Sequence, residues 1–261
     1  MHDNRPIGVY DSGIGGLTVL KKLKQFLPYE SFVYYGDTIN IPYGTKTKSE
    51  LLKITKNTMK FFKEKNVKAV VMACNTTSAA VYEDLKNEVD FILYPLVQNA
   101  CEKIADLNIN SAGVLSTEVT ANSHAYKTNL QKFKKGIEVY EHGCPSDWVK
   151  IVENNLLSDS KSKNIIKEHL NILLEKKPQK IILGCTHYPY LKNLLVQFSG
   201  KDIFVDPAEY FADFIFRDLK EKNIISESKN SNDNFYVTSN PEKFFASSQL
   251  FYKLDELPIL I

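Results

Sequence analysis

The sequence predicts an α/β protein in which two pseudo-symmetric domains, each built on a parallel sheet, face each other across a central cleft. Three observations support this fold class. Short apolar segments alternate with longer amphipathic ones, which is typical of strands and helices around a parallel sheet. Strand ends from the first half of the chain recur in order in the second half, which indicates a duplicated unit. Polar residues follow these strand ends, where open parallel sheets bind their ligands.

Nine short apolar segments are predicted as strands. Each contains β-branched or aromatic residues, is closed by a polar or turn-forming residue, and is too short for a helix. In chain order they are residues 7–10, 32–35, 69–73, 91–94, 112–115, 137–140, 181–184, 203–205 and 235–237.

Five longer segments between the strands are predicted as helices, because apolar residues return in them every three or four positions. A further helix is expected after the first strand, where Leu17, Leu20 and Leu23 share this spacing. The lysines of these segments are expected on their solvent faces. The five segments are residues 51–65, 77–87, 147–157, 162–176 and 209–222.

An internal repeat relates the two halves of the chain. Gly8 and Gly113 stand at matching positions in two predicted strands, Gly-Val-Tyr and Gly-Val-Leu. Cys74 follows Gly8 by 66 residues, and Cys185 follows Gly113 by 72. Each cysteine comes directly after an apolar strand and a small residue. The two cysteines are therefore predicted to be structurally equivalent.

The repeat also predicts the domain boundaries. Residues 1–97 together with 209–261 are expected to form the first domain, and residues 98–208 the second. If a pseudo-twofold axis relates the domains, the carboxyl ends of both sheets face one cleft. Cys74 and Cys185 would then approach this cleft from opposite sides.

Composition and charge exclude several classes of function. The chain has 33 basic and 31 acidic residues, a formal net charge of +2, and its only arginines are Arg5 and Arg217. Arginine is the residue most used to recognise bases and phosphates, so no nucleic-acid partner is expected. No apolar run approaches the roughly 20 residues that span a bilayer, and the N-terminal residues lack a signal-peptide pattern. We therefore expect a cytoplasmic protein with no membrane partner.

Cys74 lies in the segment ACNTTS, at the end of a predicted strand and the start of a helix. Unpaired backbone N–H groups and the positive end of the helix dipole favour anions at such a point, so the segment is expected to stabilise a thiolate. The alternative is that Cys74 fills space as a small apolar residue, as most buried cysteines do. The polar residues that follow Cys74 favour a reactive thiol.

Cys185 lies in a second turn of this kind, GCTHYP, which adds His187 two residues after the thiol. A cysteine–histidine pair can hold zinc, but zinc sites use three or four protein ligands, so a metal-free acid–base pair is favoured. The four cysteines are too few and too scattered for a disulfide framework. Cys101 and Cys144 have no comparable polar surroundings and are predicted to be structural, with neither at a strand end that faces the cleft.

Two further polar turns are expected at the same edge of the first sheet. Residues 11–16, DSGIGG, follow the first strand, but their glycine spacing does not match a phosphate-binding loop. The glycines are expected to allow a tight turn that presents Asp11 and Ser12 to the cleft beside Cys74. Residues 35–44, YGDTINIPYG, follow the second strand and form either a wall of the cleft or an ordinary surface turn.

Five segments together resemble the bacterial glutamate racemase family. They occur in the family's order, and the pairing of CNT with GCTH is specific to the aspartate/glutamate racemase superfamily. The resemblance implies a cofactor-independent interconversion of L- and D-glutamate that supplies D-glutamate for peptidoglycan. The segments are DSGIGGLTVL (11–20), YYGDTINIPYG (34–44), ACNTTSA (73–79), TANSHAY (120–126) and GCTHYPYL (184–191).

The resemblance implies roles for individual residues. Cys74 and Cys185 would be the catalytic acid–base pair, with Asp11, His187 and Glu153 as further catalytic residues. It implies no metal ligand and no cofactor; the partners would be glutamate and, as a possibility, a second copy of the chain. Substrate contacts would fall on Asp11, Ser12, Tyr43, Gly44, Asn75, Thr76, Thr120, Thr186 and His187.

The chemistry of racemisation is compatible with these residues. Inverting a carbon that carries a hydrogen requires a base on one face and an acid on the other, which two cysteines on equivalent strand ends can supply. A thiol is only slightly ionised at neutral pH, so a helix N-terminus and His187 are expected to adjust the pKa values of the thiols. Asp11 cannot lower the pKa of Cys74 by its charge, and is expected to relay a proton or to hold the substrate ammonium.

Two residues depart from the pattern of the family. Thr77 and Ser116 stand where alanine and glycine are commoner, and neither is a catalytic position.

Two alternative functions would fit parts of this pattern. A racemase of another acidic amino acid or of a hydantoin would use the same pair of thiols. A two-domain solute-binding protein would also enclose a cleft, but it would not need symmetric cysteines.

Overall fold

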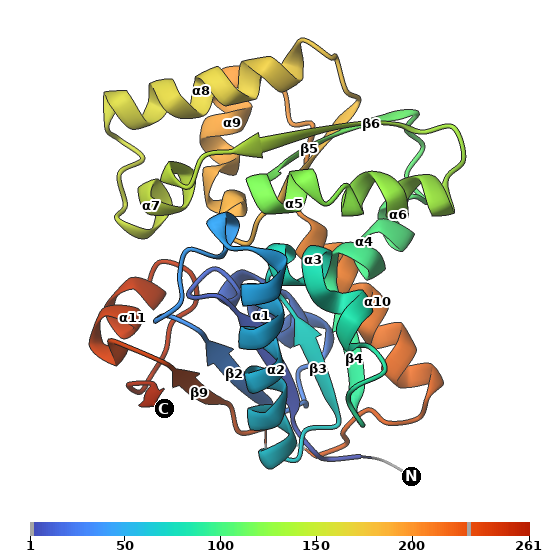
Figure 1. Ribbon diagram of the computed structural model, residues 1–261, viewed down its shortest axis with the longest axis vertical. Helices are drawn as coiled ribbons and strands as arrows, with labels where there is room; N and C mark the ends of the chain where they lie inside the picture. The colour runs from blue at the N-terminus through green and yellow to red at the C-terminus, as the bar shows by residue number, and fades with distance from the viewer. Residues whose placement is uncertain (1–2, 229–230) are drawn as a thin grey trace.

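Two parallel sheets form the framework of the protein (Figure 1). The computed structural model describes residues 3–228 and 231–261. The first sheet has six strands in the order β10-β9-β2-β1-β3-β4, and the second has four in the order β6-β5-β7-β8. The strands are β1 (Ile7–Asp11), β2 (Phe32–Gly36), β3 (Ala69–Met72), β4 (Ile92–Pro95), β5 (Ser111–Thr117), β6 (Glu138–Cys144), β7 (Lys180–Gly184), β8 (Phe204–Val205), β9 (Asn234–Val237) and β10 (Ile259–Leu260).

The strand order confirms the predicted duplication. Four strands of the first sheet run in the order β2-β1-β3-β4, and the second sheet repeats this as β6-β5-β7-β8. All of these pairings are parallel. Strands β9 and β10, from the C-terminal part of the chain, extend the first sheet beyond β2. The predicted α/β fold with two related parallel sheets is therefore correct.

Helices alternate with the strands, and the predicted ones are present with shifted ends. The helix predicted over 51–65 begins earlier because Thr47 and Glu50 form a capping box. The helix predicted over 147–157 stops at Glu153, before Asn155, which has a positive φ of 53° and interrupts right-handed helical geometry. The helices are α1 (Leu17–Phe26), α2 (Lys48–Glu64), α3 (Asn75–Leu85), α4 (Leu96–Ile104), α5 (Glu118–Asn122), α6 (Ala125–Phe133), α7 (Asp147–Glu153), α8 (Ser160–Leu174), α9 (Lys192–Ser199), α10 (Pro207–Glu221) and α11 (Pro241–Ser248), with 3₁₀ turns η1 (Tyr43–Thr45) and η2 (Tyr188–Leu191).

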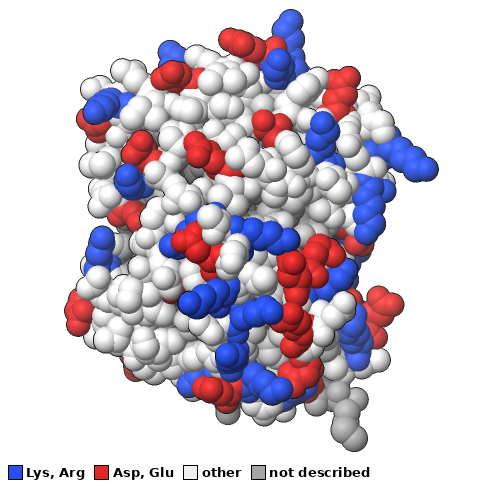
Figure 2. Space-filling view, in the orientation of Figure 1, with Lys and Arg blue, Asp and Glu red and all other residues white. Residues whose placement is uncertain are grey.

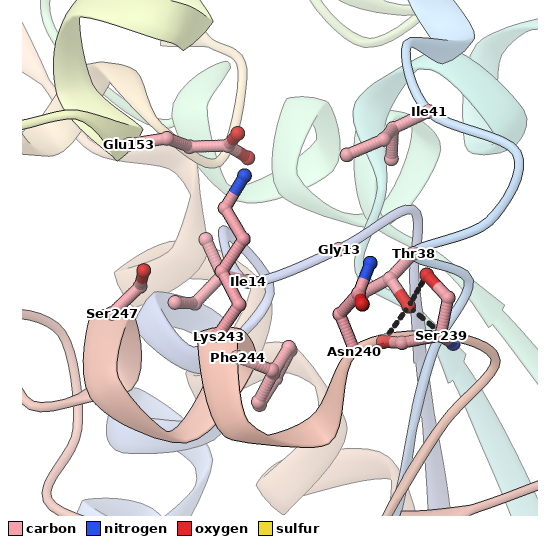
Figure 3. A pocket seen from close by; sticks show the side chains of 10 residues that line it. All are labelled: Gly13, Ile14, Thr38, Ile41, Glu153, Ser239, Asn240, Lys243, Phe244 and Ser247. Atoms are coloured by element: carbon pink, nitrogen blue, oxygen red, sulfur yellow. Dashed lines mark hydrogen bonds between the residues drawn. The ribbon is translucent and has the colours of Figure 1, made fainter.

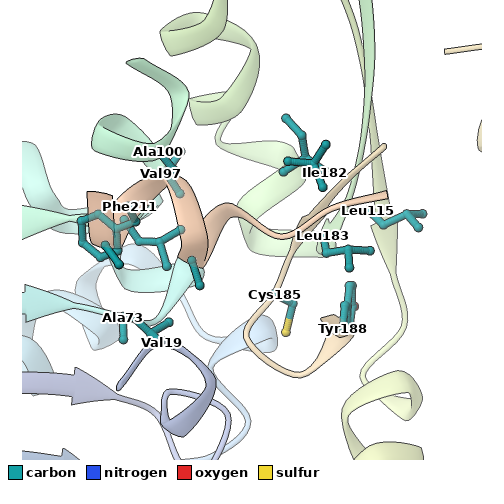
Figure 4. Packing of buried hydrophobic residues seen from close by; sticks show 14 of the residues in the cluster. Val19, Ala73, Val97, Ala100, Leu115, Ile182, Leu183, Cys185, Tyr188 and Phe211 are labelled. Atoms are coloured by element: carbon teal, nitrogen blue, oxygen red, sulfur yellow. The ribbon is translucent and has the colours of Figure 1, made fainter. Parts of the chain in front are cut away.

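One apolar core extends across both halves of the molecule. Figure 4 shows part of it, with Phe211 on α10 and Val97 on α4 on one side of the view and Leu183 of the second sheet on the other, and all three are fully buried. A second core cluster, which includes Tyr10 and Phe62, covers the other face of the first sheet. The same core cluster includes Ala73 and Tyr188, which follow β3 and β7, so apolar contacts connect the two halves near the carboxyl ends of the sheets.

The surface carries charges of both signs. On the face seen in Figure 2, Lys and Arg side chains are interspersed with Asp and Glu over both halves. Among the described residues, no helix is both long and apolar enough to cross a membrane.

A buried ion pair between Lys68 and Glu30 lies at the amino ends of β3 and β2, and Lys68 joins its own segment to three others. The Lys68 ammonium lies 2.7 Å from a Glu30 carboxylate oxygen, and both side chains are almost completely buried. Lys68 also donates hydrogen bonds to the backbone carbonyls of Asp3 (2.6 Å) and Ile224 (2.7 Å). Removing one partner of such a pair leaves a buried charge without compensation.

We expect the Lys68→Met variant to lose about 3–5 kcal/mol of unfolding free energy, because Glu30 then stays buried without its cation. Urea unfolding of the variant and the wild type measures this loss. The matched control is Lys56→Met, since Lys56 pairs with Glu88 on the surface, and such pairs contribute little. Similar midpoints for Lys68→Met and the control would contradict the assigned role of the buried pair.

Candidate active site

A cavity of about 300 Å³ lies between the carboxyl ends of the two sheets, and both halves of the chain line it. Cys74, which follows β3, and Cys185, which follows β7, are both among the lining residues. The predicted site residues that line the cavity are Cys74, Cys185, Glu153, His187, Ser12, Tyr43, Gly44, Asn75, Thr76 and Thr186. Asp11 and Thr120 were also predicted but do not line it.

Cys74 occupies the N-cap position of α3, as the sequence predicted. Its Sγ lies 3.9 Å from the Ser12 hydroxyl. Burial and the nearby Asp11 carboxylate raise the pKa of Cys74 to about 12, and this outweighs the opposite effect of the Thr76 and Thr77 backbone N–H groups. The helix N-terminus therefore acts in the expected direction at Cys74, but desolvation of the charged form dominates.

Cys185 lies at the start of a chain of polar side chains. Its Sγ is 3.9 Å from Nδ1 of His187, and Nε2 of His187 is 3.0 Å from Oε1 of Glu153. Burial lowers the pKa of His187, but Cys185 and Glu153 outweigh this effect and raise it to about 10. A protonated imidazole at neutral pH stabilises a neighbouring thiolate. The two thiols thus have different electrostatic surroundings, although they occupy equivalent strand ends.

Asp11 lies behind the wall of the cavity. Its side chain is fully buried and accepts hydrogen bonds from the Gly13 backbone N–H (3.0 Å) and the Thr186 hydroxyl (3.4 Å). Burial raises the pKa of Asp11, although the charge of His187 opposes this. The carboxylate therefore links the turn after β1 to the turn after β7, and the expectation that the glycine turn presents it to the cleft is wrong. Its catalytic role stays a prediction.

The glycines of the first turn allow this close approach between the two halves. A Cβ atom on Gly15 would lie 2.3 Å from the Thr186 hydroxyl and 2.7 Å from the His187 ring. Because such distances are far below van der Waals contact, any larger residue at position 15 would displace the second turn. This explains the glycine-rich sequence without a bound phosphate.

Hydroxyl and amide groups line the cavity beside Cys74. The Thr76 hydroxyl is 3.1 Å from that of Thr117, and Thr117 is 2.9 Å from Thr120, which joins the two halves. Tyr126 donates a 2.6 Å hydrogen bond to Oδ1 of Asn75. Nδ2 of Asn75 is buried and has no hydrogen-bond partner within the described part of the chain. This amide is therefore a donor available to a bound anion.

Several residues line the cavity although the sequence did not identify them as site residues, and three of these carry polar or reactive groups of interest: Thr117, Lys150 and Cys144. Thr117 follows Gly113 by four residues, as Ser12 follows Gly8, so the repeat could have identified it. Lys150 is the only Lys or Arg among the lining residues of the described chain, and no sequence signal pointed to it. Cys144 ends β6 and also lines the cavity. The prediction that Cys144 is away from the cleft is wrong, because β6 runs to position 144, further than the predicted 140.

A smaller pocket of about 80 Å³ adjoins the cavity (Figure 3). Glu153 and Ile41 line both spaces and form the partition between them. Lys243 on α11 extends toward the Glu153 carboxylate in this view. No group of three or more potential metal ligands occurs among residues 3–228 and 231–261.

Known proteins share both this sequence and this fold. The sequence profile of the Asp/Glu/Hydantoin racemase family matches residues 15–213. A glutamate racemase from Thermoanaerobacter pseudethanolicus is 36% identical over 250 residues, covering 95% of this chain and 93% of that protein.

Two solved structures extend this similarity to the whole fold. Glutamate racemase from Francisella tularensis in complex with D-glutamate is 35% identical, with a TM-score of 0.91 over 99% of this chain and 98% of that one. Glutamate racemase from Thermus thermophilus in complex with beta-chloro-D-alanine is 30% identical, with a TM-score of 0.87 over 100% of this chain and 98% of that one. Together with the paired cysteines in one cavity, these similarities show that the chain belongs to the Asp/Glu/Hydantoin racemase family and, within it, to the glutamate racemases.

Proposed function

We propose that this protein interconverts L- and D-glutamate by proton transfer at Cα between the thiols of Cys74 and Cys185, without a cofactor. The observation that carries the proposal is that equivalent strand ends of the two halves bring both thiols to one cavity. An acid and a base on opposite faces of one carbon are what inversion requires. The similarity to a glutamate racemase solved with D-glutamate supports the choice of substrate.

The different surroundings of the thiols suggest how one turn of the reaction begins. The thiolate of Cys185, beside protonated His187, takes the proton from Cα, and the thiol of Cys74 donates its proton to the opposite face. Burial and Asp11 keep Cys74 protonated through its raised pKa, so it starts as the acid. After this step Cys185 carries a proton and Cys74 is a thiolate, which is the starting state for the reverse direction. Glu153 holds the imidazole ring of His187 in place.

The substrate carboxylates have several donors in the cavity. The unpartnered amide of Asn75 and the hydroxyls of Thr76 and Thr186 suit the carboxylate at Cα, because they lie beside the thiols. Lys150 provides the cationic group that a second carboxylate would favour. Ser12, Tyr43 and Gly44 also line the cavity and complete the proposed contacts. Thr120 and Asp11 would act from behind the wall, through the hydroxyls of Thr117 and Thr186 that they contact.

We also propose a domain division and a cellular role. Residues 1–97 with 209–261, and residues 98–208, would move as two bodies, so that closure excludes water from the cavity. The product D-glutamate would serve peptidoglycan synthesis in the cytoplasm. The similarity to bacterial glutamate racemases supports this role.

The decisive test is to incubate the purified protein with L-glutamate in deuterated water. We expect loss of optical rotation and appearance of D-glutamate that carries deuterium at Cα. The thiol that delivers the new hydrogen has first exchanged its proton for deuterium from the solvent. Early in the reaction the remaining L-glutamate should carry little deuterium, because a separate thiol removes its proton. Chiral chromatography with mass spectrometry measures both quantities. Racemisation of aspartate or a hydantoin, with glutamate untouched, would overturn the proposed substrate.

Replacing either Cys74 or Cys185 by alanine should lower kcat/KM by roughly 10²- to 10⁴-fold in both directions, the usual contribution of a general acid or base. Cys101→Ala is the matched control, because Cys101 is an equally buried thiol on α4 outside the cavity. Circular dichroism of the L- and D-glutamate reactions gives the rates. Ordinary turnover by Cys74→Ala would rule out the two-thiol mechanism.

The raised pKa of His187 predicts how stability depends on pH. A group whose pKa rises on folding, here from 6.5 to about 10, stabilises the folded state below pH 6.5 and loses this contribution as the pH rises toward 10. Relative to the His187→Asn variant, the wild type should lose up to about 1.4 kcal/mol per pH unit in this range. Urea unfolding between about pH 6 and 9 measures this difference while Cys74 keeps its proton. Parallel stability curves would show that His187 gains no charge on folding.

A further inference from the structure

The carboxylate of Asp37 is buried beneath one wall of the cavity. Asp37 directly follows β2, and only 1% of its surface is exposed. Residues 41–45 line the cavity, whereas Asp37 does not. Asp37 therefore lies behind the wall that residues 41–45 form.

Three side chains donate hydrogen bonds to this carboxylate. The Tyr43 hydroxyl donates to Oδ2 at 2.5 Å, and Nδ2 of Asn40 lies 2.9 and 3.0 Å from the two oxygens. The Thr238 hydroxyl, just after β9, donates to Oδ1 at 3.0 Å. Hydrogen bonds to a carboxylate are stronger than those between neutral groups, so Asp37 is the centre of this cluster.

The cluster determines which way Tyr43 faces. The Tyr43 hydroxyl also lies 2.8 Å from the Tyr10 hydroxyl, and the side chain is 3% exposed. This hydroxyl is thus committed to Asp37 and Tyr10 inside the protein. Tyr43 still lines the cavity, but its hydroxyl is held by these two partners.

The same junction is reinforced by a second contact. Thr38 donates to the carbonyl of Ser239 at 2.7 Å and accepts from its N–H at 2.8 Å, and Figure 3 shows these two residues side by side. The turn after β2 is therefore bound to the segment after β9 at adjacent positions. Residues close to the C-terminus thereby hold the cavity wall from outside.

We infer that Asp37 is a positioning residue, which holds the 41–45 wall in place through the Tyr43 hydroxyl and so sets the affinity of the cavity for its substrate. This inference rests on the proposed function, since it concerns binding of glutamate. Asp37 does not touch the cavity, so its loss should affect binding more than proton transfer. Because residues 41–45 contain neither of the two thiols, the KM values of both enantiomers should change alike.

Two measurements on the full-length protein test the role of Asp37. The first is hydrogen–deuterium exchange of a peptide covering 38–45 without substrate, in the wild type, Asp37→Asn and Asp37→Ala. The second is steady-state kinetics with L- and D-glutamate on these proteins, on Tyr43→Phe and on the double variant Asp37→Asn/Tyr43→Phe. Asp233→Asn is the matched control, because Asp233 accepts a hydrogen bond at the opposite end of β2.

For Asp37→Asn we expect faster exchange of the amides in 38–45 than in the wild type, and unchanged exchange in the second sheet. We also expect KM to rise about tenfold for both enantiomers while kcat stays within about twofold. A change of about tenfold corresponds to the loss of one hydrogen bond to a charged group. Both effects should be larger in Asp37→Ala than in Asp37→Asn, because asparagine keeps one acceptor oxygen. The double variant should resemble Asp37→Asn, since Tyr43 acts through Asp37. Asp233→Asn should match the wild type in KM.

The positioning role of Asp37 would be overturned if its variants showed unchanged exchange in 38–45, an unchanged KM, or a loss confined to kcat. Additive effects of the two substitutions in the double variant would also overturn it. A wild type that does not racemise glutamate would instead overturn the proposed function. The exchange measurement would then still decide whether Asp37 holds the wall, because it requires no substrate.

Discussion

The parallel pairing of β1 with β3, and of β5 with β7, is the constraint on which the site depends. Parallel strands end at one edge of their sheet, so the turns that follow them become neighbours. In the first sheet this brings Ser12 beside Cys74, and in the second it brings the turn after β5 near Cys185. Because the same strand order occurs in both sheets, one local arrangement supplies both sides of the cavity.

The symmetry of the backbone does not extend to the charges. The Asp11 carboxylate lies close enough to Cys74 that its charge adds to the cost of ionising this buried thiol. Cys185 has His187, supported by Glu153. A racemase needs its two groups in opposite protonation states at the start of each turn. The charged neighbours of Cys74 and Cys185 differ, so the two thiols can differ in protonation state although they lie at equivalent strand ends.

The sequence predicted the parts of the site that follow from local pattern. The repeat and the strand ends identified Cys74, Cys185 and the surrounding turns, because these depend on chain order alone. The burial of Asp11 was not predictable, since it involves the close packing of Gly16 on its side chain and the contact with Thr186 of the second half. Cys144 and Lys150 reach the cavity through the length of β6 and the start of α7. The shortest helices, such as α5, have too few turns for their periodicity to be recognised.

The pairing of β9 with β2 has a consequence for how the chain folds as it is made. Every strand of the second sheet lies within one continuous stretch of sequence, whereas the first sheet requires strands separated by some 200 residues. During synthesis from the N-terminus, the second sheet can therefore assemble while the first still lacks its outer strands. Thr238 is synthesised after every strand of the second sheet, and it closes the contact that supports the cavity wall. Both thiols are thus in place before the pocket that would receive a substrate is complete.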